Sequence, residues 1–164
     1  IAGCSTIVAV DVVPSRLEMA LECGATHTVN GREVADPVAE IKKITNGGAH
    51  FSVECSGIPA LSLQALGCLR RLGLCVLVSV TGEATAPIPL EPMLMNPSST
   101  LAGLTEGGSN PQIFIPKLVQ YYQEGRLPID KLIKFYDFND IEQAFADSAS
   151  GKTIKPILRL NNID

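Results

Sequence analysis

The chain has 164 residues, of which 46% are hydrophobic and 18% are charged, with 13 basic and 17 acidic side chains. This length and composition are typical of a globular protein that folds without disulfides or a structural metal. A formal net charge of −4 provides no basic surface for nucleic acid, and no apolar run approaches the ~20 residues of a membrane-spanning helix. We therefore expect neither nucleic acid nor a membrane as a partner.

The five cysteines argue against both a disulfide framework and a zinc knuckle, because their number is odd and none are spaced Cys-x-x-Cys. They favour a reducing cytoplasm. The chain opens at Ile1 with neither an initiator Met nor a signal-peptide pattern. From this start we expect the chain to have been cut from a longer protein.

Strand and helix patterns alternate along the first half of the chain. Pro14 suits a first helical turn, Asp36 with Pro37 suits a capped helix start, and Gly24 suits a helix end. The predicted strands cover residues 5–10, 28–29, 51–54 and 74–80, and the predicted helices cover 14–22, 37–46 and 60–69. This alternation predicts an α/β fold with a parallel, doubly wound sheet.

A proline-rich stretch over 86–97 interrupts this rhythm, and the second half of the chain is of another kind. A helix is predicted from Asn110 to Gly125, followed by strands over 132–136 and 154–160. Between these strands, Asn139 and Glu142 predict a helix that starts with a capping box. We expect a domain boundary near Thr105, which divides the chain into 1–105 and 106–164.

Asp11 is the most informative single residue, because it stands at the carboxyl end of a buried strand. Ligands of doubly wound sheets bind outside these strand ends. A carboxylate there can accept both hydroxyls of an adenosine ribose and would repel a 2′-phosphate, which favours NAD over NADP. Alternatively, Asp11 only caps its loop. Arg16 either lies over the ribose or is simply solvated.

Other polar residues give no catalytic constellation. His27 and His50 flank strands at spacings that suit neither a triad nor a metal site, so structural roles are favoured. Cys55 follows a strand without a paired histidine and is interpreted as a lining or core residue. Glu54 and Glu106 do not form an evident acid–base pair. The Gly-x-Gly-x-x-Gly turn that should precede the Asp11 strand is absent.

Several segments together resemble the zinc-type medium-chain alcohol dehydrogenases, and the resemblance extends over essentially the whole chain. The segments are residues 7–11, 21–26 with Asn30, 47–54 and 150–158. Residues 110–118 and 127–132 are similar to the aryl-alcohol (benzyl-alcohol) dehydrogenase branch. The resemblance implies an NAD-dependent oxidoreductase that converts aromatic primary alcohols to aldehydes by hydride transfer.

The resemblance also implies a set of cofactor-binding residues. Asp11 and Arg16 match the residues that bind the adenosine ribose. Ser56 and Gly57 match the segment that lines the adenosine and ribose side of the cofactor groove. Lys155 matches a basic residue that reaches the pyrophosphate. The strand end beneath the nicotinamide is matched by Val78, Ser79 and Val80, and main-chain contacts to the carboxamide by Leu104 and Glu106. No catalytic or metal-binding residue is assigned within this chain.

The family's catalytic zinc ligands, first strand and phosphate-binding turn have no counterpart in these residues. In the strand order 3-2-1-4-5-6, a missing strand 1 leaves a gap of roughly 10 Å in an incomplete Rossmann sheet. We therefore expect an incomplete Rossmann domain followed by a short α+β return segment of the catalytic domain. This chain alone is expected to be inactive. The edge strand near Thr100–Gly103 is expected to pair in a homo-oligomer.

Two alternatives remain open. Methyltransferases of Rossmann type also place an acid after their second strand, which would make S-adenosylmethionine the ligand. The chain could instead be a non-enzymatic, truncated module whose open sheet edges pair with another chain.

Overall fold

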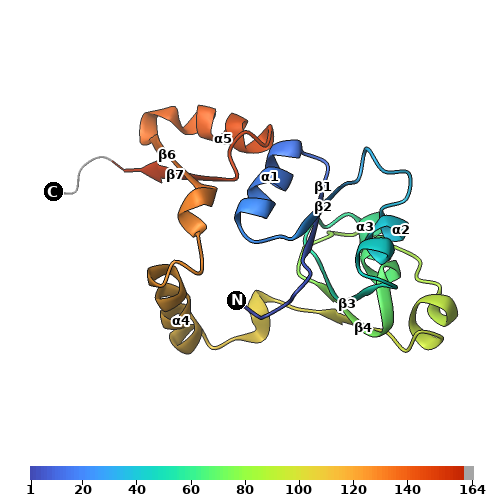
Figure 1. The fold of residues 1–164 in the computed structure, drawn as a ribbon. Coiled ribbons are helices and arrows are strands. Elements are labelled where there is room, and N and C mark those ends of the chain that lie inside the picture. The colour runs from blue at the N-terminus through green and yellow to red at the C-terminus, as the bar shows by residue number, and fades with distance from the viewer. Residues whose placement is uncertain (161–164) are drawn as a thin grey trace.

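A computed structural model describes residues 1–160 (Figure 1). The strands are β1 (Val8–Asp11), β2 (His27–Asn30), β3 (Ala49–Glu54), β4 (Leu69–Leu77), β5 (Thr100–Gly103), β6 (Ile133–Asp137) and β7 (Lys155–Arg159). The α-helices are α1 (Pro14–Glu22), α2 (Pro37–Ile44), α3 (Pro59–Gly67), α4 (Pro111–Gln123) and α5 (Ile141–Ala149). Strands and helices alternate through β4, as the sequence predicts.

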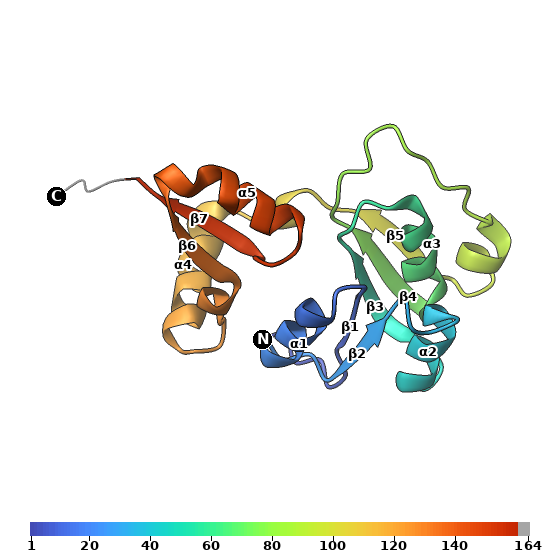
Figure 2. The same ribbon diagram turned by 90° about the horizontal axis from the view of Figure 1, so that it is seen from above.

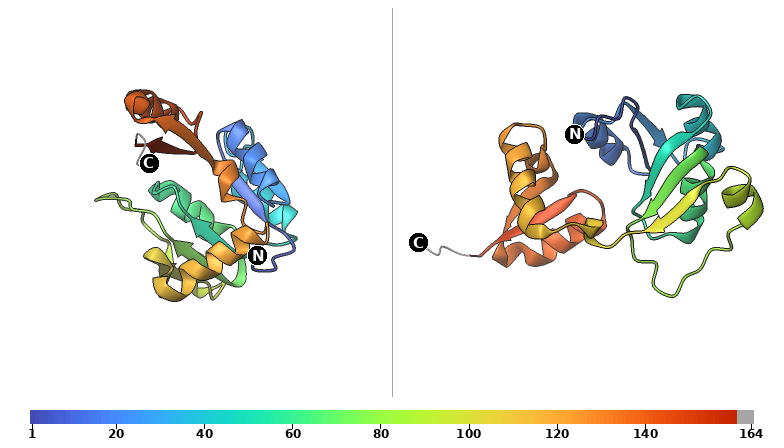
Figure 3. Two further views of the ribbon diagram at one scale, coloured as in Figure 1. Left: turned by 90° about the vertical axis from the view of Figure 1, so that its left-hand side faces the viewer. Right: turned by 90° about the horizontal axis from the view of Figure 1, so that it is seen from below.

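Among residues 1–160 all strand pairs are parallel, and they form three separate sheets. β1 pairs with β2, β3–β4–β5 form a second sheet with β5 at its edge, and β6 pairs with β7 (Figure 3). The predicted α/β class with parallel sheets is confirmed. Within residues 1–160 no ladder joins β1 to β3. The break between the β1–β2 and β3–β4–β5 sheets lies at the place of the missing strand 1 that the sequence predicts.

The core is divided between the two N-terminal sheets. Val29, Ile41 and Cys68 are buried beside β2 and α2, and a second cluster forms around Leu66 and Cys75. α1 and α2 lie on opposite sides of the β1–β2 pair, while α3 packs on β3 and β4 (Figure 2). The two N-terminal sheets are therefore covered by helices where their buried side chains lie.

Helix starts follow local chemistry closely. Each of the first four α-helices has Pro in its first turn, where the missing N–H is not needed. The Asp36 carboxylate accepts a hydrogen bond from the Ala39 N–H at 3.1 Å, and the Asn110 side chain accepts one from the Gln112 N–H at 3.0 Å. The predicted cap at Asp36 is confirmed, and the helix predicted to start at Asn110 has that residue as its N-cap.

The predicted bounds around β4 are wrong. α3 ends at Gly67, two residues before its predicted end, and the chain enters β4 at Leu69. β4 ends at Leu77, so 78–80 follow the strand instead of completing it. The pairing of β3 with β4 shifts register between Ala49 and Phe51, which marks an irregularity that the apolar pattern does not encode.

The predicted capping box is also wrong. α5 begins at Ile141, and its N-cap residue, Asp140, makes no side-chain capping bond. Asn139 lies in the short turn before the helix, where its N–H and its side-chain amide both donate to Asp137 Oδ1 at 2.9 Å. Asp137 thus stabilises that turn, and this local bonding displaces the expected cap.

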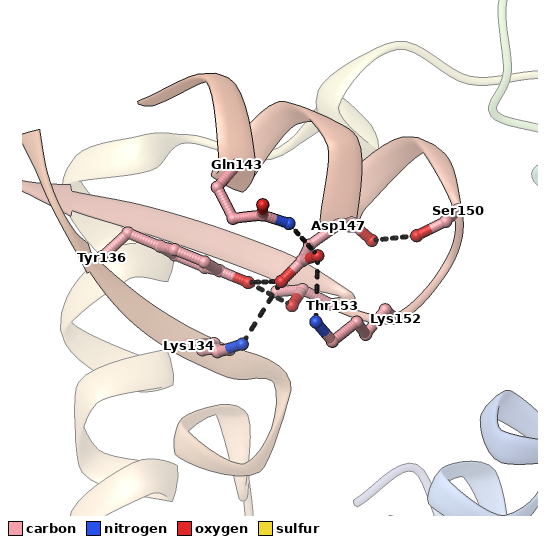
Figure 4. A network of polar contacts seen from close by, with 7 residues as sticks. All are labelled: Lys134, Tyr136, Gln143, Asp147, Ser150, Lys152 and Thr153. Carbon is pink, nitrogen blue, oxygen red and sulfur yellow. Dashed lines mark hydrogen bonds and ion pairs between the residues drawn. The ribbon is translucent and has the colours of Figure 1, made fainter. Parts of the chain in front are cut away.

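The C-terminal part is held together by the buried carboxylate of Asp147 on α5 (Figure 4). Tyr136 Oη of β6 donates to it at 2.8 Å, and Gln143 Nε2 donates at 2.7 Å. Lys134 and Lys152 pair with the same carboxylate at 3.4 and 3.2 Å. One acidic side chain therefore joins β6, α5 and the turn before β7. The predicted boundary near Thr105 stays a prediction.

Across residues 1–160, none of the helices has both the length and the apolar character needed to cross a membrane.

Candidate functional site

The predicted cofactor residues concentrate at the carboxyl ends of the parallel strands. Asp11 is the last residue of β1, and Ser56 and Gly57 follow β3. Residues 78–80 follow β4 and Leu104 follows β5. Because neighbouring parallel strands end at the same edge of a sheet, the last three groups share one edge.

Two backbone hydrogen bonds extend the ladders beyond the strands at this edge. The Val78 N–H donates to the Glu54 carbonyl at 3.0 Å, and the Leu104 N–H donates to the Leu77 carbonyl at 3.0 Å. The residues after β3, β4 and β5 are thus held side by side, which is what a ligand lying across the strand ends requires.

The Asp11 carboxylate combines a local and an outward role. Its Oδ1 accepts hydrogen bonds from the Val12 and Val13 N–H groups at 2.7 and 2.9 Å. Its Oδ2 lies 3.8 Å from Arg16 Nη1, and the side chain is 31% exposed. The loop-capping alternative is therefore correct for one oxygen. The second oxygen is paired with Arg16, and the side chain as a whole stays partly exposed.

Arg16 lies at a junction with the C-terminal part. A Cβ placed on Gly151 would stand 3.5 Å from Arg16 Nη2, so the guanidinium lies against that turn. A second contact joins the same helix to the C-terminal part, between Glu22 and Lys131 at 3.7 Å. Arg16 therefore lies between Asp11 and the turn at Gly151.

Glu54 is the functional candidate that sequence reasoning missed. It is the last residue of β3 and only 5% exposed. Burial acts to raise the pKa of its carboxyl, but hydrogen bonds from Ser56, Ser79 and the Gly57 N–H outweigh burial and hold that pKa below its ordinary value. The signal available in the sequence was the same as for Asp11: an acid at the end of an apolar strand.

Gly57 permits the loops after β3 and β4 to touch. Its φ is +74°, and a Cβ placed on it would stand 2.6 Å from the Val80 carbonyl oxygen. Both the left-handed backbone and the absence of a side chain are needed here. The loop that carries Ser56 is therefore packed directly on the loop that carries Ser79.

Lys155 and Glu106 are not joined to this group. Lys155 opens β7 and is exposed, and Glu106 lies in a short turn with φ +51°. Among the described residues, neither side chain makes a hydrogen bond or ion pair with another predicted site residue. Their predicted roles stay predictions.

The remaining candidates make local contacts. Thr26 Oγ1 lies 2.9 Å from His27 Nδ1, and Arg70 Nη1 lies 3.0 Å from His50 Nε2. Cys55 is exposed. In the described part of the chain, no three His, Cys, Asp or Glu side chains come close enough to hold a metal ion. The donor set of these residues therefore does not fit a catalytic zinc.

Two hollows flank the sheets, and neither includes a predicted site residue. One, of about 170 Å³, is apolar and lies between α3 and residues 81–88. The other, of about 340 Å³, lies beside β2 and the start of α1.

Comparison with known proteins agrees with this arrangement. Residues 1–121 match the family profile described as "Zinc-binding dehydrogenase". The chain belongs to this family. A crystal structure of an alcohol dehydrogenase zinc-binding domain protein from Burkholderia ambifaria superposes with a TM-score of 0.93 at 46% identity, over 98% of this chain and 43% of that one. The resemblance predicted from the sequence is confirmed.

Two further similar proteins are named for their substrates. Benzyl alcohol dehydrogenase from Acinetobacter calcoaceticus is 43% identical with a TM-score of 0.91, over 96% of this chain and 43% of that one. Geraniol dehydrogenase from Castellaniella defragrans is 34% identical over 157 residues, which are 95% of this chain and 42% of that protein. The chain thus spans less than half the length of the relatives it matches.

Proposed function

We propose that this chain is part of an NAD-dependent zinc-type alcohol dehydrogenase that oxidises aromatic primary alcohols to aldehydes, and that it comprises an incomplete cofactor domain and the return segment of the catalytic domain. The observation that carries the proposal is Asp11 at the carboxyl end of β1, where its side chain stays partly exposed beside Arg16. Membership of a dehydrogenase family supports it. Similarity to a benzyl alcohol dehydrogenase supports the aromatic substrate.

The nicotinamide of a bound NAD would supply the hydride acceptor. This chain's own residues bind and orient the cofactor. Asp11 accepts the adenosine ribose hydroxyls, with Arg16 beside it, and the loops after β3 and β4 support the rest. In this proposal the further contacts come from Ser56, Gly57, Val78, Ser79, Val80, Leu104, Glu106 and Lys155.

Zinc enters this proposal only through the family. The described residues lack a donor set for it, so we derive no activation of the alcohol and no proton transfer from this chain. We therefore expect the 164 residues alone to be inactive. Steady NADH formation from this chain with NAD, zinc and benzyl alcohol would contradict that expectation.

The cofactor preference tests the proposal directly. We expect the natural polypeptide that carries these residues to bind NADH more tightly than NADPH, because the Asp11 carboxylate repels a 2′-phosphate. Asp11→Asn should weaken NADH binding by about tenfold, which is the effect of one hydrogen bond to a charged group. The same change should reduce the ratio between the affinities for NADH and NADPH. Titration calorimetry with both dinucleotides measures these affinities.

Glu18→Gln serves as the matched control, since Glu18 is exposed on α1 and should leave both affinities unchanged. Equal or tighter binding of NADPH by the unaltered protein would refute the NAD assignment. Binding of S-adenosylmethionine without NADH would favour the methyltransferase alternative instead.

A non-enzymatic pairing module is the second candidate, and the free edges of β1, β3 and β5 within residues 1–160 favour it. In that case another chain would pair with these edges, as we also propose for a homo-oligomer formed through β5. Analytical ultracentrifugation with nucleotide titration separates the candidates, because an obligate dimer without nucleotide affinity supports the module alone.

A further inference from the structure

Glu54 is a carboxylate that the proposed function does not yet use. It is buried at the edge where the candidate cofactor residues meet, and a buried carboxylate is stable only when its oxygens are well supplied with donors. Its donors come from two loops, and Ser79 lies 25 residues further along the chain.

The two oxygens of Glu54 accept hydrogen bonds from both loops. Oε1 accepts from the Ser56 N–H at 2.7 Å and from the Ser56 hydroxyl. Oε2 accepts from the Ser79 hydroxyl at 2.7 Å and from the Gly57 N–H at 3.4 Å. One side chain therefore fastens the loop after β3 to the loop after β4.

The same bonds also orient two hydroxyl groups. The hydrogens of Ser56 and Ser79 are both donated to Glu54, so each Oγ faces other groups only as an acceptor. Ser56 Oγ already accepts from the Ile58 N–H at 3.1 Å. These serine oxygens can therefore accept a hydrogen bond from a ligand hydroxyl, but they have no hydrogen to donate to a ligand acceptor.

We propose that Glu54 is a positioning residue for the cofactor: it fixes Ser56, Gly57 and Ser79 and turns both serine hydroxyls into acceptors for the cofactor's hydroxyl groups. This inference rests on the proposed function. The close approach of Gly57 to the Val80 carbonyl supports it, since the two loops have no room to shift independently.

The test compares Glu54→Gln with Ser79→Ala in the natural polypeptide. The amide that Glu54→Gln introduces presents two hydrogens in place of one acceptor oxygen, so it cannot accept from both loops. We expect the Kd for NADH to rise about tenfold in Glu54→Gln and by a smaller factor in Ser79→Ala. In the double variant the two factors should not multiply, because both remove the same contact. Glu18→Gln is the control.

Hydrogen exchange of the Ser56 and Gly57 amides supplies a readout that is independent of the cofactor. We expect both amides to exchange faster in Glu54→Gln. If Glu54→Gln does not fold, the NADH affinity of Ser79→Ala tests the positioning role, because that variant removes only the bond from the loop after β4. A folded variant with unchanged NADH affinity would overturn the positioning role. If the unaltered protein bound no NADH, the proposed function would fall and the positioning role with it, while exchange would still report whether Glu54 joins the loops.

Discussion

Asp147 is the residue through which the C-terminal part should respond to acid. Its carboxylate is nearly inaccessible, and its four donors come from β6, from α5 itself and from the turn before β7. The hydrogen bond from Tyr136 is the main reason that the pKa of Asp147 lies well below its ordinary value of 3.8. Burial opposes this shift, and Gln143, Lys152 and Lys134 add to it.

The sign of the pH effect follows from that shift. The folded carboxyl binds its proton at a lower pH than the unfolded one, so its contribution to stability is complete above the unfolded pKa. The contribution is lost as the pH falls below about 4 toward the folded pKa. We expect the melting temperature to fall over this range, as measured by circular dichroism.

Asp147→Asn isolates this residue from other carboxylates such as Glu54. The variant should melt on the order of 5 °C lower at neutral pH and should lose part of the acid dependence. Asp130→Asn, at an exposed position, is the control. A variant that kept the full acid dependence would assign it to other groups.

At the residue scale, the sequence could point to Asp11 but not to the role of Glu54. Both acids end an apolar strand, and the pattern is the same. What separates them is tertiary: Asp11 remains partly exposed beside Arg16, whereas Ser79 reaches Glu54 from a different loop. A contact across 25 residues leaves no local signal in the chain.

The turn from α2 into β3 shows how an element can depend on one position. Gly47 and Gly48 both have positive φ. A Cβ on Gly47 would meet nothing within 4 Å, whereas a Cβ on Gly48 would stand 2.5 Å from the Arg70 backbone nitrogen. The predicted helix end at residue 46 agrees with either glycine as the residue that matters, so the sequence does not separate them.

We therefore expect Gly48→Ala to destabilise the fold more than Gly47→Ala does. Both variants strain a left-handed residue, at about 1 kcal/mol, but only Gly48→Ala also pushes β4 away from β3, for a total of roughly 3 kcal/mol. Urea unfolding followed by circular dichroism measures the free energy of unfolding of both variants. Equal losses would show that β4 moves away from Gly48 without a measurable loss of stability.

At the element scale, helix starts could be predicted and the turns between elements could not. Prolines and cap residues act within a few positions, so Asp36 and Asn110 were identified correctly. The prediction of a capping box at Asn139 was wrong because the neighbouring Asp137 accepts the Asn139 N–H. Which acceptor takes this N–H depends on local geometry that the residue spacing does not specify.

The whole molecule leaves one apolar sheet face without a helix among residues 1–160. Ser52 donates to the Ala65 carbonyl of α3 at 2.7 Å, so the alternating residues Phe51 and Val53 point to the opposite face of β3. They are 67% and 64% exposed. In the sheet they are paired with Leu74 and Val76, which extend the apolar surface across β4.

This uncovered face predicts that the 164-residue chain by itself will bind an apolar fluorescent dye and associate as its concentration rises. The paired change Phe51→Thr and Val53→Thr should reduce both effects while altering the free energy of unfolding by no more than about 0.5 kcal/mol, because side chains this exposed contribute little packing. Phe145→Gln is the matched control, since it removes a 70% exposed aromatic ring from α5 and leaves the sheet face intact. Dye fluorescence and light scattering measure the outcome. If the control lowered both signals as much as the paired change, the association would arise from scattered apolar residues and not from the open face of β3.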